Sequence, residues 1–327
     1  MLPTQHHRKD FEDFEDFDPR ARHEALLREC AGLAPVPCAV VHPCDPGSLE
    51  GALAAHAAGL IRATLVGPAE RIAAVARGLG ADLAGAGVEV LDAPHSHAAA
   101  ELAARLAAEG GARALMKGSL HTDELIRAVV TQPGLRTGRR MSHVFRFDVP
   151  MYHKPLYITD AALNISPSLS EKVDIAQNAI DFVRAMGVEA PRVAILAAVE
   201  TVNPSMPSTL DAAALCKMAE RGQLRGGVLD GPLAFDNAIS REAARVKGIS
   251  SPVSGEVDIL LAPDIEAGNM LAKQLEYLAG ATCAGVVLGA RVPIALTSRA
   301  DAATARVASA ALVSLLAHRR APAEGAR

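Results

Sequence analysis

The sequence predicts an α/β protein built from two domains. The chain has 327 residues, which suits two domains of common size or one large α/β unit. Half of the residues are apolar, but only 3% are aromatic and Trp is absent, a composition typical of helices that pack closely on sheets. Short β-branched runs also alternate with Ala-rich stretches along most of the chain. These observations favour β-α units and a largely parallel sheet.

The first series of β-α units begins at about residue 38. Ala-rich helical stretches separate its expected strands, which are PCAVVHP, ATLVGP and VEVLDAP. Asp45 followed by Pro46 predicts the start of the first helix, because Asp caps helices and Pro suits the first helical position. Gly59 fits the end of that helix.

A second series follows in the other half of the chain. Its apolar runs each lead into a Gly, Pro or Asp turn, and they are RVAILAAVE, GGVLDGP, VDILLAPDIEAGN and AGVVLGA. Residues 142–163 separate the two series and alternate in shorter runs, which indicates a crossing between domains. Residues 300–320 predict a final amphipathic helix that ends in Arg, where the helix dipole favours a cation.

This pattern predicts the domain division. We expect a first domain from residues 21–147 plus 290–327 and a second domain from residues 148–289. Residues 1–20 form an acidic tail without a core pattern, and we expect it to be disordered. A docking stripe is the alternative for this tail, made by three aromatic residues at three-residue spacing, namely Phe11, Phe14 and Phe17.

Charge and composition exclude several functions. A formal net charge of -4 and a pI near 6.3 provide no basic field for nucleic acid. No apolar run reaches the roughly 18 to 20 residues that span a bilayer, and the polar N-terminus does not resemble a signal segment, so we expect a cytoplasmic protein without membrane contact. Five cysteines without a CxxC pair predict reduced thiols. Cys38, His42 and Cys44 are close enough to suggest metal ligands, but a strand entering a loop explains them better.

Common nucleotide and hydrolase fingerprints are missing. GLGADL lacks the third Gly of a dinucleotide motif, and neither GxxxxGK nor GxSxG occurs. What remains is a set of Gly, Ser, Thr and Arg turns at the carboxyl ends of expected strands, where open α/β sheets bind their ligands.

The first of these turns lies in ALMKGSLHTDELIRAVV. Gly118 permits a tight turn after the strand, and Thr122 is placed to cap the next helix. Lys117, Ser119 and Thr122 are therefore candidates to surround an anion, and the planar guanidinium of Arg127 suits phosphate. The alternative is a capped helix with a solvated Arg.

The second turn lies in VPIALTSRADAATARV, where we expect a strand to end at Leu296 and a helix to begin near Asp301. Ser298 and Arg299 lie at the junction and are candidates to stabilise an oxyanion. Asp301 is a candidate base or a helix cap.

Two further turns carry small polar groups. Asp230, Asp236 and Asn237 lie in DGPLAFDNAIS, and Asp160 and Asn164 lie in TDAALNISPSLSEK. Neither segment has the dense carboxylate spacing of a calcium loop, so we do not favour a metal site there.

These turns resemble those of the phosphate acetyltransferase/phosphate butyryltransferase family, more closely those of its butyryltransferases. The similarity runs from about residue 113 to residue 318. Its segments are MKGSLHTDELIRAVV, GLRTGRRMSHV, ITDAALNISPSLSEK, NPSMPSTLDAA, GGVLDGPLAFDNAIS, DILLAPDIEAGNMLAKQL and GVVLGARVPIALTSRAD.

The resemblance implies a fold like that of isocitrate and isopropylmalate dehydrogenases, with two α/β domains flanking a cleft, in a homodimer. It implies a catalytic role for Ser298 and Arg299 and places Arg127 in the phosphate and coenzyme A pocket. Relatives carry an Asp about two helical turns after the Arg, which acts as a base toward the thiol, and this chain has Ala305 at that spacing. Asp301 is the nearest carboxylate and is our candidate for that role.

The implied reaction converts acyl-CoA and inorganic phosphate into acyl phosphate and free coenzyme A, reversibly and with a short acyl group such as acetyl or butyryl. Coenzyme A is a substrate, and no metal or redox cofactor is implied. The expected substrate-binding residues are Lys117, Gly118, Ser119, Thr122, Arg127, Asp160 and Asn164. Two alternatives stay open, a noncatalytic acyl-CoA or phosphate sensor and a metal-dependent decarboxylating dehydrogenase of the same fold.

Overall fold

The computed structural model describes residues 19–298 and 301–319. Two sequence-based expectations lie outside these ranges. The acidic tail with Phe11, Phe14 and Phe17 is one, and the side chain of Arg299 is the other.

The described chain is a mixed α/β structure that divides into two compact units. Of the described residues, unit 1 contains 19–25, 145–180 and 189–283, and unit 2 contains the remainder. Helix α1 (Pro19–Glu29) and helix α6 (Leu169–Ala185) each contain residues of both units. The same holds for the strands β5 (Ser142–Asp148) and β10 (Thr282–Leu288). The α/β class predicted from the sequence is confirmed, and the domain boundaries stay a prediction.

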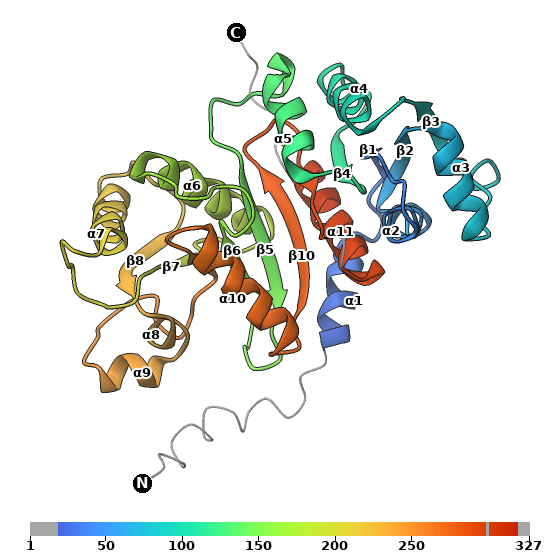
Figure 1. Cartoon of the computed structure of the whole chain (residues 1–327). Coiled ribbons are helices and arrows are strands. Elements are labelled where there is room, and N and C mark those ends of the chain that lie inside the picture. The colour runs from blue at the N-terminus through green and yellow to red at the C-terminus, as the bar shows by residue number, and fades with distance from the viewer. Residues whose placement is uncertain (1–18, 299–300, 320–327) are drawn as a thin grey trace. The chain divides into compact units, whose positions relative to one another are not determined.

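Unit 2 contains the first series of β-α elements (Figure 1). Its strands are β1 (Val36–Val41), β2 (Ile61–Gly67), β3 (Glu89–Asp92), β4 (Ala114–Lys117) and β11 (Ile294–Ala295). Its helices are α2 (Pro46–Ala57), α3 (Ala69–Gly78), α4 (Ser96–Ala108), α5 (Thr122–Thr131) and α11 (Ala303–Arg319), with the 3-10 helix η2 (Pro133–Leu135). The predicted start of α2 is confirmed, because Asp45 caps it by accepting a 2.9 Å hydrogen bond from the backbone N–H of Ser48.

The strand order of unit 2 contains a reversal. From one edge the order is β3-β2-β1-β4-β11-β10, in which β3, β2, β1, β4 and β11 are parallel to one another and β10 is antiparallel to β11. The chain moves outward from β1 to β2 and β3, and then returns to the opposite side of β1 for β4. Right-handed connections therefore place α2 and α3 on one face and α4 on the other. Accordingly α2 contacts α3 and α11, whereas α4 contacts α5.

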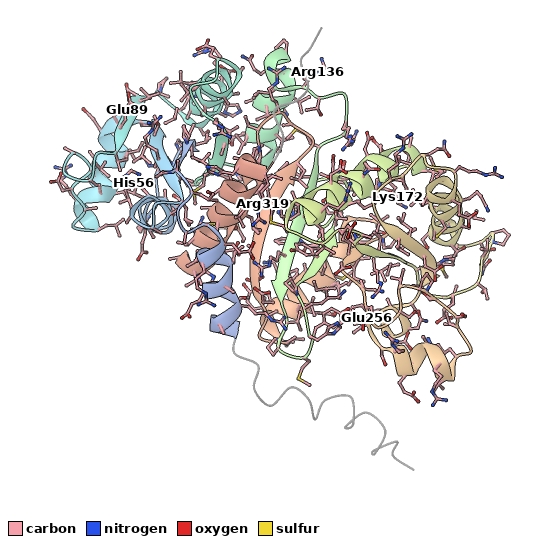
Figure 2. All side chains as sticks on the ribbon, turned by 180° about the vertical axis from the view of Figure 1, so that it is seen from behind. His56, Glu89, Arg136, Lys172, Glu256 and Arg319 are labelled. Carbon is pink, nitrogen blue, oxygen red and sulfur yellow. The ribbon has the colours of Figure 1, made fainter. Side chains whose placement is uncertain are left out.

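Unit 1 contains the second series of elements. Its strands follow the order β5-β6-β9-β7-β8, in which β6, β9, β7 and β8 are parallel. The strands are β6 (Leu156–Thr159), β7 (Arg192–Leu196), β8 (Val228–Leu233) and β9 (Ile259–Leu261). The remaining helices are α7 (Pro207–Glu220), α8 (Phe235–Ile239), α9 (Arg241–Val246) and α10 (Ile265–Tyr277). Lys172 on α6, labelled in Figure 2, forms a 2.6 Å ion pair with Asp211 of α7.

The final helix differs from the prediction. Helix α11 ends at Arg319 as expected, but it is not amphipathic, because its residues from 308 to 317 are all buried. Ala and Leu dominate this segment, and these small and medium side chains let a helix pack closely on more than one side. The sequence period was therefore a poor guide to the surroundings of α11. Within the described residues, none of the helices combines the length and apolarity needed to cross a bilayer.

Candidate active site

Three strands of unit 2 end at the same edge of its sheet. The parallel register pairs Val41 of β1 with Lys117 of β4, and Met116 of β4 with Ala295 of β11. The loops that follow these strands therefore start side by side. They lie where the strand order reverses between β1 and β4, the place where open α/β sheets bind ligands.

Gly118 allows the loops after β1 and β4 to touch. Its backbone N–H donates to the carbonyl of Val41 at 2.9 Å. A Cβ atom at this position would lie 2.4 Å from that oxygen and 2.6 Å from the carbonyl oxygen of His42. Backbone atoms cannot move aside as the end of a side chain can, so only glycine fits this approach.

Ser119 links the two loops. Its hydroxyl donates to the carbonyl of His42 at 2.8 Å and accepts from the N–H of Cys44 at 3.2 Å. The ring Nδ1 of His42 lies 3.1 Å from the same oxygen. His42 has a φ of 53°, which is uncommon for a residue other than glycine, and these contacts hold it there. Burial and the nearby cation Arg71 lower the pKa of His42, so we expect its imidazole to be neutral at pH 7.

The basic residues after β4 differ in environment. Lys117 is buried, and its Nζ lies 3.4 Å from the carbonyl oxygen of Gly118. Arg127 is exposed on α5, and its guanidinium has no hydrogen bond or ion pair within the part of the chain that the structure describes. Thr122 is the first residue of α5 and does not cap it, since His121 occupies the cap position and forms no side-chain cap bond. The expected cap was therefore placed one residue too late.

The loop after β11 is held from two sides. The N–H of Ser298 donates to Oδ2 of Asp301 at 2.7 Å, and the carbonyl of Ser298 accepts from Nη2 of Arg306 at 3.0 Å. Ser298 is exposed, and α11 begins at Ala303, two residues after Asp301. The loop geometry thus fixes the backbone that leads directly into Arg299.

Arg306 is a site residue that we did not predict. It lies in the first turn of α11, is only 2% exposed, and also donates from Nη1 to Oγ1 of Thr297 at 2.8 Å. The sequence carried a weak signal, because Arg is rare among the apolar residues of a buried helix. We use the name strand-end site for the group that these contacts and this register bring together, namely His42, Lys117, Gly118, Ser119, Ser298 and Arg306.

The polar turn after β6 in unit 1 is built around Asp160. Its Oδ1 accepts from the N–H groups of Ala162 and Leu163 at 2.9 Å, and its Oδ2 accepts from Nδ2 of Asn164 at 2.6 Å. Both side chains are buried, and Gly268 of α10 packs against the carbonyl of Asp160. These contacts give Asp160 and Asn164 a clear part in shaping the turn, and their predicted contact with substrate stays a prediction.

The turn after β8 in unit 1 contains a small group of ion-paired side chains. Lys247 lies 2.8 Å from Asp236 and 2.7 Å from Glu200, and Asn237 hydrogen bonds to Glu200. Hydrogen bonds from Lys247 are the main reason why the pKa values of Asp236 and Glu200 are lowered. Asp230 lies within β8 itself, where its carboxylate accepts from the N–H of Gly231.

Known proteins match this chain over most of its length. A model of the family described as phosphate acetyl/butaryl transferase matches residues 94–314. A phosphate acetyltransferase from Rhizobium meliloti is 56% identical over 305 residues, covering 93% of this chain and 96% of the relative.

The chain belongs to the phosphate acetyl/butyryl transferase family. A phosphate butyryltransferase from Clostridium acetobutylicum is 42% identical over 84% of this chain and 90% of its own. A crystal structure of a branched-chain phosphotransacylase from Enterococcus faecalis V583 is similar in fold, with a TM-score of 0.74 and 27% identity, and covers 86% of this chain and 99% of its own. The family resemblance recognised in the sequence is therefore confirmed. The expected greater similarity to the butyryltransferases is wrong, because the acetyltransferase is 56% identical and the butyryltransferase 42%.

Four of the five thiols of this transferase are poor nucleophiles, because burial raises the pKa of Cys30, Cys38, Cys44 and Cys216. Cys30, Cys38, Cys44 and Cys283 are buried, and none of the five cysteines forms a disulfide. Burial raises the pKa of Cys38 to about 12 and that of Cys30 to about 11. A thiol that remains protonated at neutral pH does not attack a thioester readily. This agrees with a reaction in which no enzyme nucleophile takes part.

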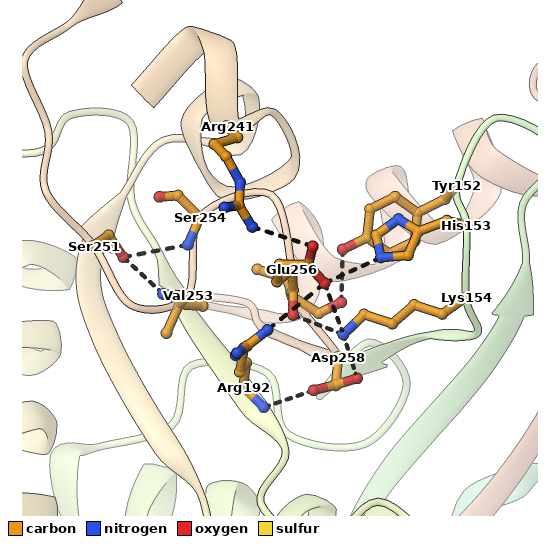
Figure 3. Close-up of polar contacts among 11 residues, drawn as sticks. Tyr152, His153, Lys154, Arg192, Arg241, Ser251, Val253, Ser254, Glu256 and Asp258 are labelled. Carbon is orange, nitrogen blue, oxygen red and sulfur yellow. Dashed lines mark hydrogen bonds and ion pairs between the residues drawn. The ribbon is translucent and has the colours of Figure 1, made fainter. Parts of the chain in front are cut away.

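A second group of charged side chains lies at the amino-terminal ends of strands in unit 1, and we call it the Glu256 cluster (Figure 3). Its members are His153, Lys154, Arg192, Arg241, Glu256 and Asp258. They lie just before β6, at the start of β7, on α9 and just before β9, so they join the amino-terminal ends of three parallel strands.

Both carboxylates of the Glu256 cluster are paired with cations of the cluster. Glu256 lies 3.2 Å from Arg241, 3.6 Å from Arg192 and 3.2 Å from His153. Asp258 lies 2.7 Å from Lys154 and accepts from the backbone N–H of Arg192 at 2.7 Å. Burial opposes ionisation of Glu256, but the hydrogen bond and charge of His153 and the nearby cations outweigh it, so the pKa of Glu256 is lowered. These contacts connect the amino-terminal ends of β6, β7 and β9.

Proposed function

We propose that this chain reversibly transfers a short acyl group between coenzyme A and inorganic phosphate. The observation that carries the proposal is the convergence of three strand ends in unit 2, with Lys117 and Arg306 beside the loop of Ser298, in a chain of this transferase family. Cations and hydroxyl groups at such an edge are suited to hold phosphate and the charged groups of an acyl-CoA.

The chemistry needs proximity and charge stabilisation more than a protein nucleophile. In the direction that forms acyl-CoA, a base removes the thiol proton, and the thiolate attacks the carbonyl carbon of acyl phosphate. The bond between the acyl carbon and the bridging oxygen of the phosphate then breaks, and phosphate leaves. We propose that Arg299 and the backbone donors of the Ser298 loop stabilise the oxyanion that forms between these steps. Asp301 is the proposed candidate for the base.

Substrate binding is proposed for the residues predicted from the sequence. Lys117, Gly118, Ser119, Thr122 and Arg127 are proposed to contribute to the phosphate and coenzyme A site. The hydroxyl of Ser119 donates its hydrogen bond to the carbonyl of His42, so we propose that Ser119 contributes by holding the loop in shape. Asp160 and Asn164 are also proposed to bind substrate.

The wider assembly also stays at the level of proposal. We propose a homodimer and a dehydrogenase-like pair of α/β domains flanking a cleft. We propose no metal or redox cofactor, and the cytoplasmic location expected from the sequence stays a prediction.

The test is release of free thiol from acetyl-, propionyl-, butyryl- and longer acyl-CoA, with and without phosphate. We expect thiol release only when phosphate is present, with the same rate in EDTA. Hydrolysis without phosphate as the main activity would contradict the proposal and indicate a thioesterase. Acyl-CoA binding without turnover would indicate the sensor, whereas loss of activity in EDTA together with a change in nicotinamide absorbance would indicate the dehydrogenase.

A further inference from the structure

Arg306 is a buried cation whose partners are all neutral. Its two Nη atoms donate to Oγ1 of Thr297 and to the carbonyl of Ser298, and its buried Nε has no hydrogen-bond partner among the described residues. No carboxylate lies within 4.0 Å of its guanidinium in the described ranges 19–298 and 301–319. A buried charge that is not paired is costly, so a purely structural residue at this position would not need to be Arg.

Two helix N-termini lie close to Arg306. It lies in the first turn of α11, where the helix dipole disfavours a cation. Gly47, in the first turn of α2, also lies close, since a Cβ there would be 3.8 Å from Nη2 of Arg306. The nearby carboxylate of Asp45 is engaged in capping α2 through Ser48. Two helix N-termini and a guanidinium therefore share one side of the Ser298 loop.

The fold also makes room for this side chain. A Cβ at Gly51 of α2 would lie 2.4 Å from Cδ and 2.8 Å from Cβ of Arg306. The close approach of α2 and α11 thus requires a glycine opposite Arg306.

We propose that Arg306 is a positioning residue for the transfer reaction and that its charge helps to bind the anionic phosphate. Its two donors fix the side chain of Thr297 and the backbone of Ser298, the residue that precedes Arg299 in the sequence. Its charge attracts an anion that binds at this edge of the sheet. This inference rests on the proposed function, because it assigns phosphate as the anion.

The deciding variant is Arg306→Met, which has a similar length but no charge. We expect kcat to fall at least 50-fold and the KM for phosphate to rise at least fivefold, with little change in the KM for acyl-CoA. We expect the melting temperature to stay equal or rise, because an unpaired charge leaves the core. Arg306→Lys restores the charge and should recover kcat to within tenfold of the native value. Arg77→Ala, which removes an exposed Arg of α3, is the matched control and should behave as the native protein.

Retention of kcat and of the phosphate KM within threefold in a folded Arg306→Met protein would overturn the proposal. A lower kcat accompanied by a lower melting temperature, with both KM values unchanged, would show that Arg306 has only a structural role. That outcome would also overturn the proposal. If Arg306→Met does not fold, Gly51→Ala decides, since it displaces the guanidinium without removing it. A folded Gly51→Ala protein should show a raised phosphate KM, and an unchanged phosphate KM would overturn the proposal.

A binding measurement separates this inference from the proposed function. Inorganic phosphate alone should raise the melting temperature of the native protein in proportion to its binding, and Arg306→Met should lose that shift. If thiol release is absent but the phosphate shift depends on Arg306, the transfer reaction is wrong and the anion site stands. If the native protein shows no phosphate shift, the charge role of Arg306 is overturned.

Discussion

The strand-end site of unit 2 and the Glu256 cluster of unit 1 both collect charged side chains at the ends of parallel strands, but they balance charge differently. In the Glu256 cluster, Glu256 and Asp258 each lie within reach of cations of the same cluster. In the strand-end site, Arg306 is buried against a hydroxyl and a carbonyl. Carboxylates that are paired within their own cluster stabilise the fold, whereas a buried cation with only neutral partners can attract an anionic ligand.

The largest effect that this comparison predicts is at Arg299, the cation next to Ser298. We expect Arg299→Ala to lower kcat by about 10²-fold or more, the usual scale for losing one oxyanion-stabilising donor. The KM for acyl-CoA should change less, because the contact strengthens in the transition state. Arg299→Lys should recover little, since an ammonium does not reproduce the planar fork. Steady-state kinetics checks this, and near-normal turnover of Arg299→Ala would show that the site is misplaced.

The next effect breaks the contact between the loops of the strand-end site. In Gly118→Ala the new Cβ meets two backbone oxygens, so the loops must separate. We expect at least tenfold lower kcat and a loss of about 1 to 3 kcal/mol in the free energy of unfolding, as for other overpacked sites. Gly78→Ala is the matched control, because a Cβ there meets nothing within 4 Å. Equal behaviour of the two variants in kinetics and urea denaturation would contradict the role of Gly118.

The variant Asp301→Asn tests the proposed base. Its amide oxygen can still accept from the N–H of Ser298, so the loop should keep its shape. An amide does not take up the thiol proton, so we expect kcat to fall by about 10²-fold. Turnover within about fivefold of the native value would show that Asp301 only shapes the loop and that the base lies elsewhere. A pH–rate profile separates the two roles, because loss of a base removes one limb of the profile.

The smallest effect on activity is expected in the Glu256 cluster. Glu256→Gln should leave kcat unchanged and lower the melting temperature at pH 7 by about 1 to 3 °C, as for partly exposed ion pairs. The pKa of Glu256 is lowered in the folded state, so its contribution to stability is present above its ordinary pKa of 4.5 and is lost as the pH falls through the folded value. Thermal melts of native and variant proteins should therefore converge at low pH. A fall in kcat would show that this cluster reaches the site.

The sequence was most informative where local rules decide the structure. Asp45 and Pro46 predicted the start of α2, and Gly118 marked the tight turn after β4. Both depend on a few adjacent residues, so no knowledge of the fold was needed.

Features that depend on packing between distant segments were harder to predict. Arg306 is buried because α2 presents Gly51 to it, about 250 residues earlier in the chain. Helix α11 was expected to be amphipathic, and its burial on several sides follows from neighbours that no local pattern reveals. The Glu256 cluster likewise joins β6, β7 and β9, whose adjacency is set by the strand order.

The position of β11 in its sheet has a consequence for how the protein is made. This strand pairs with β4 through Ile294 and Leu115, and the segment between them contains nearly all of unit 1. During synthesis, the β1-to-β4 region therefore emerges with one strand edge uncovered and α2 without its partner helix, and it stays so until α11 is released. Exposed edges and late long-range pairing favour off-pathway association. Unit 1 can form most of its contacts earlier, so at this stage of synthesis unit 2 is the part of the nascent chain that most needs a chaperone.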